Sequence, residues 1–215
     1  MPAADLKTAL KANTAHSEPS AIRLHRAISW LARAEQEAED PDARFIFLWI
    51  ALNAAYAKQF GFERVERGNL QNFIDTLLQV DQGGSLKQVV FSQFSGPIRV
   101  LINNKYIFEG FWKALRDHDA SDRWSTDFST ANARAMQAVM ANQTGVVLSI
   151  VFDRLYVLRN QLVHGGATWN SQVNRAQISD GANILGRLVP LIIELMIEHP
   201  ELDFGEILYP PIAPM

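Results

Sequence analysis

The sequence predicts an all-α fold, a compact bundle of several helices. Apolar residues recur at spacings of three and four along most of the 215 residues, and helix-start and helix-stop residues flank these stretches. No stretch alternates apolar and polar residues as a strand would. A chain of this length buries roughly two-thirds of its unfolded surface. We therefore expect one domain over residues 20–215, preceded by a flexible N-terminal segment, 1–19.

Two helices are predicted in the first third of the chain. Ser17 and Pro19 favour a start for "SEPSAIRLHRAISWLARAEQEAED", and Asp40 followed by Pro41 marks a second start. The stretch "ARFIFLWIALNAAYAKQFG" is apolar nearly all round before Gly61 stops it, which predicts a central, buried helix. Asn53 lies on its Trp49 face, and we expect a satisfied amide there.

Shorter helices are predicted over 69–80, 85–95 and 108–118, separated by "DQGGS", "SGPIR" and "NNKY". The polar stretch "DHDASDRWSTDFST" predicts a loop. A polar amphipathic helix at 130–142 precedes two longer helices, 145–163 and 174–199. Pro190 predicts a kink in the last helix, and the tail "ILYPPIAPM" predicts an extended, surface-lying end.

Composition limits the classes of function. The chain has no cysteine, which excludes disulfides and thiol nucleophiles, and no apolar run approaches the roughly 20 residues that span a bilayer. We expect a cytoplasmic protein without a membrane segment. The formal charge of −3 does not indicate nucleic-acid binding. Residues 145–190, however, hold four arginines, no lysine and two acids, so an anionic partner would prefer that region.

The stretch "LRNQLVHGG" at 158–166 places an arginine late in an apolar helix. At 100° per residue, Arg159 lies at the centre of an apolar arc, so its guanidinium needs a carboxylate, backbone carbonyls, solvent or an anionic ligand. A structural salt bridge is one interpretation. Asn160 and His164 lie on a second stripe, and two glycines end the helix. The arc consists of Leu148, Phe152, Leu155, Leu158, Leu162 and Val163.

Together, these side chains favour phosphodiester chemistry. Arg159 supplies a fixed positive charge, Asn160 a hydrogen-bonding amide, and His164 a group that titrates near neutral pH.

The stretch "RNQLVH" resembles the motif of the HEPN superfamily, which has an arginine, a polar residue, three further residues and a histidine. These are all-helical domains, many of them metal-independent RNA endonucleases. "FDRLYVLRNQLVHGGATWNSQVNR" and "FIFLWIALNAAY" look like an uncharacterised bacterial branch close to the Apea-like HEPN group, over a region from about residue 40 to the end.

The resemblance implies a catalytic set of Arg159, Asn160 and His164, completed by a second subunit in a homodimer formed through the motif helix. That packing would explain an arginine within an apolar face. Family members that are modified by a partner nucleotidyltransferase carry a tyrosine two residues after the histidine, where this chain has Gly166. This departure argues against that regulation.

Other residues are weaker candidates. Trp169 is a candidate for base stacking or for a packing lid, and Arg175 and Arg154 are candidates for phosphate binding. Glu194, Glu198 and His199 lack the two-histidine spacing of a zinc helix. We expect neither metal nor cofactor.

Two hypotheses follow. The first is a metal-independent RNA endonuclease that uses the 2′-hydroxyl as nucleophile, acting as a toxin or antiphage effector under a regulatory partner, and leaving DNA uncut. The second is a non-catalytic homodimeric HEPN module that binds a nucleotide-like ligand or a protein. The intact motif favours the first, and the acidic total charge favours the second.

Overall fold

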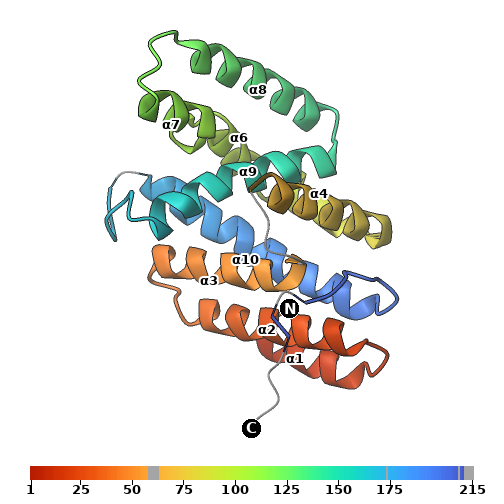
Figure 1. The fold of residues 1–215 in the computed structure, drawn as a ribbon. Helices are drawn as coiled ribbons and strands as arrows, with labels where there is room; N and C mark the ends of the chain where they lie inside the picture. The colour runs from red at the N-terminus through yellow and green to blue at the C-terminus, as the bar shows by residue number, and fades with distance from the viewer. Residues whose placement is uncertain (58–62, 173, 208, 211–215) are drawn as a thin grey trace. The chain divides into compact units, whose positions relative to one another are not determined.

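A computed structural model of the chain describes residues 1–57, 63–172, 174–207 and 209–210. Within these residues it contains ten α-helices and no strand, which confirms the predicted all-α class (Figure 1). The chain divides into two compact units, whereas a single domain was expected over residues 20–215. Unit 1 comprises residues 1–85 and 182–215, and unit 2 comprises residues 86–181.

Unit 1 begins with helix α1 (Ala3–Ala12), where a flexible segment was expected. Ala3 and Leu6 of this helix are fully buried, and α1 packs against α2 (Glu18–Glu35). A short segment with only a few apolar residues gains enough from burying them to stay ordered. The Ser17 side chain caps α2 by accepting a hydrogen bond from the Ser20 N–H, as the start residues predict.

Helix α3 (Pro41–Tyr56) lies alongside α2 (Figure 1). Asp40 caps it by accepting from the N–H groups of Asp42 and Ala43. Half of α3 is buried, as predicted, but it ends at Tyr56, and Gly61 lies outside the described residues. The Asn53 Oδ1 atom is buried without a hydrogen-bond partner among the described residues, so the expectation of a fully satisfied amide is not met.

A buried arginine joins three parts of unit 1. Arg23 of α2 is 1 % exposed and donates hydrogen bonds to the carbonyl oxygens of Ala55 and Ala57, at 3.1 and 2.9 Å. It also donates to three successive carbonyls of the C-terminal segment, residues 204–206, at 3.1–3.4 Å. Burial lowers the pKa of Arg23, while the Asp203 carboxylate raises it. This arginine, which lies within α2, therefore ties the C-terminal segment to α2 and to the end of α3.

Helix α4 (Glu63–Val80) starts before the predicted residue 69. The predicted helix at 85–95 is interrupted: α5 (Ser85–Gln88) passes into a π-helical turn, η1 (Val89–Gln93). Helix α6 (Ser95–Ile102) then runs through the "SGPIR" segment that was expected to separate two helices. Pro97 falls in the first turn of α6, where a missing N–H costs no hydrogen bond.

The rest of unit 2 comprises a 3₁₀ turn, η2 (Lys105–Ile107), and the helices α7 (Glu109–Arg116), α8 (Arg123–Met140) and α9 (Thr144–Val163). Helix α9 packs against both α6 and α8. The start of α8 lies within the predicted loop of residues 117–130. Its exposed Ser129 and Thr130 donate hydroxyl hydrogen bonds to carbonyls four residues back, so polar residues that favour loops are satisfied on a solvated helix face.

The last helix, α10 (Arg175–Glu198), begins in unit 2 and continues in unit 1, with Pro190 in its interior. Its bounds and those of α9 agree with the predicted 174–199 and 145–163 within one residue. The predicted extended tail falls mostly outside the described residues. The exposed Tyr209 and Pro210 are its last described part.

Candidate functional site

The end of α9 carries the predicted motif. His164 is the C-cap residue, and Gly165 follows in the left-handed conformation at φ 69°. The backbone N–H of His164 donates to the Asn160 carbonyl at 3.0 Å, and the Ala167 N–H donates to the Gln161 carbonyl at 3.1 Å. Glycine adopts this backbone conformation without a Cβ penalty, so Gly165 ends the helix, in line with the predicted stop.

Arg159 is half-buried and held by its neighbour. Its Nη1 donates to Asn160 Oδ1 at 2.8 Å, and its guanidinium carbon lies 5.9 Å from the centre of the Tyr156 ring. No carboxylate of the described residues forms a salt bridge with it, which disfavours the structural salt bridge interpretation. The remaining N–H groups of Arg159 are therefore available to a ligand.

The fully buried arginine of α9 is Arg154, which is 5 % exposed. Its guanidinium lies 4.7 Å from the Phe108 ring centre and 5.5 Å from that of Phe128. Its Nη2 donates to the Ile102 carbonyl at 3.5 Å and to Asn132 Oδ1 at 3.4 Å. Burial lowers the pKa of Arg154 to about 10, against an opposing effect of Asp153. Its predicted role in substrate binding is wrong, because a guanidinium enclosed by two rings cannot reach a phosphate.

The apolar arc around Arg159 was expected to pack against a second subunit. Four of its six members, Leu148, Phe152, Leu155 and Leu158, are at most 2 % exposed within the chain itself. The face that the prediction assigned to a second copy is thus already covered. Of the six, only Leu162 and Val163 in the last turn are not buried, and Val163 is 50 % exposed.

His164 is exposed, and its imidazole has no partner among the described residues. No described contact joins its side chain to Arg159. Trp169, which is 73 % exposed, does not form the packing lid that was one interpretation. Arg175 is the first residue of α10, and its Nε donates to the Ser171 carbonyl at 3.2 Å.

Gly166 occupies a position with little space. A Cβ atom there would lie 3.2 Å from the Gln161 carbonyl oxygen. Any larger residue at 166 would require this carbonyl to move by a few tenths of an ångström.

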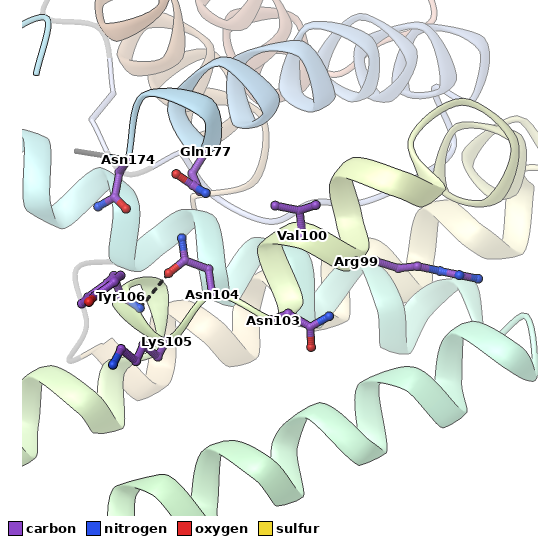
Figure 2. Close-up of a pocket in the computed structure, with 8 residues that line it drawn as sticks. All are labelled: Arg99, Val100, Asn103, Asn104, Lys105, Tyr106, Asn174 and Gln177. Carbon is purple, nitrogen blue, oxygen red and sulfur yellow. Dashed lines mark hydrogen bonds between the residues drawn. The ribbon is translucent and has the colours of Figure 1, made fainter. Parts of the chain in front are cut away.

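Gln161 was missed as a functional residue. Its Nε2 donates to the Tyr106 carbonyl at 2.6 Å, and its Oε1 accepts from Asn174 Nδ2 at 3.0 Å. Both partners line an open pocket of about 730 Å³ within unit 2 (Figure 2). The "NNKY" segment, Asn103–Tyr106, supplies half of this pocket, although the sequence suggested only a break between helices. In the sequence, two asparagines followed by a lysine and a tyrosine were the feature that could have indicated this pocket.

The two units carry opposite net charges. Residues 86–181 contain ten Lys and Arg and seven Asp and Glu, a net charge of +3, while the rest of the chain contains ten and sixteen, a net of −6. The acidic total therefore comes from unit 1 alone. The unit that carries the motif is basic, which weakens the charge argument against an anionic ligand.

Comparison with known proteins finds no match to a family model, a curated protein or a solved structure. In the described part of the chain, no three His, Asp or Glu side chains are grouped to hold a metal, and no helix is long and apolar enough to cross a membrane.

Proposed function

We propose that the protein is a metal-independent RNA endonuclease of the HEPN type, with Arg159, Asn160 and His164 as its catalytic set. The observation that carries this proposal is the state of these side chains at the end of α9. A guanidinium that has no carboxylate partner in the described part of the chain is fixed by an amide at 2.8 Å, and an exposed imidazole follows at the helix cap. The positive net charge of unit 2 supports the proposal.

The reaction is an internal transesterification. The RNA 2′-oxygen attacks the adjacent phosphorus, the bond from phosphorus to the 5′-oxygen breaks, and the 2′-hydroxyl proton passes to solvent. His164 donates a proton to the leaving 5′-oxygen, a contribution of roughly 100- to 10,000-fold. Arg159 stabilises the charge that develops on the phosphoryl oxygens, and Asn160 holds the guanidinium in place.

A second subunit completes the site in this proposal. Since the middle of α9 is already buried, the two-fold contact involves its exposed last turn around Val163, and not the whole apolar face. A toxin or antiphage role under a regulatory partner remains part of the proposal. Gly166 argues against control by nucleotide transfer to a tyrosine.

The test is cleavage of a defined single-stranded RNA in the presence of a chelator. We expect a 2′,3′-cyclic phosphate or 3′-phosphate on the upstream fragment and a 5′-hydroxyl on the downstream fragment. Arg159→Ala and His164→Ala should each lose at least about 100-fold in rate. The matched controls are Arg116→Ala and His25→Ala, which change exposed residues elsewhere in the chain and should cut normally. A single 2′-deoxy nucleotide at the cut site should abolish cleavage there, and a 5′-phosphate end would refute the mechanism.

The non-catalytic module remains a second candidate for a specific reason. The hydrogen bond from Arg159 to Asn160 lies within one helix, as in a pair that only stabilises a helix end. In that case the protein binds a nucleotide-like ligand or a protein partner and produces no RNA fragments, and the same experiment separates the two functions.

A further inference from the structure

The pocket beside the motif has a lining suited to a nucleotide chain. It has a volume of about 730 Å³ and contains two cations, four amides, one tyrosine and one valine, with no carboxylate in its described lining (Figure 2). The lining residues are Arg99, Val100, Asn103, Asn104, Lys105, Tyr106, Asn174 and Gln177.

Tyr106 is an exposed ring on a fixed backbone. Its N–H donates to Asn104 Oδ1 at 2.8 Å, and its carbonyl accepts from Gln161 at 2.6 Å and from Trp112 Nε1 at 2.7 Å. The ring meets Phe111 edge to face at 5.4 Å yet stays 45 % exposed. A ring held in place before binding loses little entropy when a base stacks on it.

The positive charge lies next to this ring. The Lys105 ammonium is 5.2 Å from the Tyr106 ring centre, and Figure 2 shows the two side chains next to one another. Arg99 extends away from the amides, which places its charge at the pocket edge (Figure 2). Neither cation forms a salt bridge with a carboxylate of the described residues, so both charges are available to a phosphate.

Amides from two elements offer both donors and acceptors. The Asn104 Oδ1 atom accepts a hydrogen bond from the Tyr106 N–H, which leaves the Asn104 NH₂ group for a ligand. Asn174 donates one N–H to Gln161, which leaves the Asn174 oxygen for a ligand. Gln177, in the first turn of α10, has both groups free of described partners. Such a mixed set matches the hydrogen-bonding edge of an unpaired base.

We propose that this pocket binds one nucleotide of a single-stranded RNA, with its base stacked on Tyr106 and its phosphate at Lys105, while Arg99 at the pocket edge meets a neighbouring phosphate of the strand. The choice of RNA rests on the proposed function, and the rest of the inference on the pocket. Small-molecule sites are mostly apolar and enclose their ligand, whereas this pocket is open and seven of its eight lining residues carry a polar or charged group, as in strand-binding grooves. Gln161 belongs to the motif hexapeptide and lies three residues before His164 on the same side of α9, so a strand held here runs towards the end of the helix that carries His164.

The experiment is fluorescence anisotropy with a labelled single-stranded octaribonucleotide, in the His164→Ala background so that the strand stays intact. Tyr106→Leu should weaken binding at least about fivefold, and Tyr106→Phe should restore it, since stacking needs only the ring. Lys105→Gln should weaken binding and reduce the salt slope by about 0.7, the value for one lost phosphate contact on a single strand. Tyr209→Leu and Lys113→Gln, exposed residues outside the pocket, are the matched controls.

Wild-type affinity in both Tyr106→Leu and Lys105→Gln would overturn the inference, even if the protein cuts RNA. Equal affinity for a mononucleotide and the octamer would overturn the choice of a strand as occupant. Pocket-dependent binding without any cleavage by the wild-type protein would support the inference and refute the proposed nuclease function. Thermal unfolding of each variant separates lost binding from lost folding, and Lys105→Gln changes an exposed side chain whose removal leaves the core intact.

Discussion

Three single substitutions in and beside one helix separate a catalytic role from a structural one. His164→Ala and Arg159→Ala change the proposed catalytic pair, and Arg154→Ala changes the buried arginine of the same helix. We expect the first two to remove cleavage while the protein stays folded. Arg154→Ala should instead lower the free energy of unfolding substantially.

The magnitudes follow from the surroundings of each side chain. His164 is exposed without a described partner, so its loss should cost less than about 0.5 kcal/mol. Arg159 loses one hydrogen bond to Asn160, about 1 kcal/mol. Arg154→Ala removes the contacts of the guanidinium with two rings, which are worth about 2 kcal/mol when desolvated. It also leaves two acceptors without their donor and creates a cavity. The lowered pKa shows that burial of the charge opposes part of this loss, and we expect a net loss of about 3 kcal/mol, in the range for breaking a buried network.

Urea unfolding followed by circular dichroism measures the stabilities, and the cleavage assay in chelator measures the activities. The reasoning fails if His164→Ala loses about 2 kcal/mol or more, because the imidazole would then have buried partners. It also fails if Arg159→Ala is as destabilising as Arg154→Ala.

Three further predictions concern assembly and stability. Val163→Glu should convert the proposed dimer into a monomer in light scattering, because it places a charge in the exposed last turn of α9; an unchanged dimer would exclude that contact. Burial raises the pKa of Asp180, so the carboxylate costs stability above that pKa and the cost disappears as the pH falls through it. Asp180→Asn should therefore raise the melting temperature at pH 7 but not at pH 3, and an equal effect at both would contradict this cause. Arg23→Met should cost about 3 kcal/mol and expose residues 204–206 to proteolysis, since the carbonyls of Ala55 and Phe204 lose a buried donor; unchanged protection would show that the arginine does not hold this segment.

Local chemistry explains why many helix ends could be predicted. Asp40 caps α3 through its own side chain, and Gly165 ends α9 through its own backbone conformation. Such signals act over a few residues and need no knowledge of distant contacts. The polar stretch at 117–130 gave the opposite local signal, yet its second half is helical. There, hydroxyls bond back to the helix, and the rings of Trp124 and Phe128 contact those of Phe111 and Phe108.

The candidate site was predicted only in part. The hexapeptide located Arg159, Asn160 and His164 at the end of a helix, because motif spacing and helix period are properties of the sequence. The hexapeptide could not show that the Arg154 guanidinium packs against the rings of Phe108, in the turn before α7, and Phe128, in α8. These two residues are 46 and 26 positions away from the arginine in the chain. The pocket was missed for the same reason, because Tyr106 and Asn174 meet only through Gln161.

By itself, the sequence determined the helical class, the limits of the motif helix and the motif residues, because periodicity, caps and glycines act locally. The tertiary structure alone decided which arginine is buried, which face of α9 is covered, and that unit 2 carries a basic, amide-lined pocket beside the motif. A helix that is apolar nearly all round has no unique buried side until its neighbours are placed. Side chains far apart in the chain form a site only where packing brings them together.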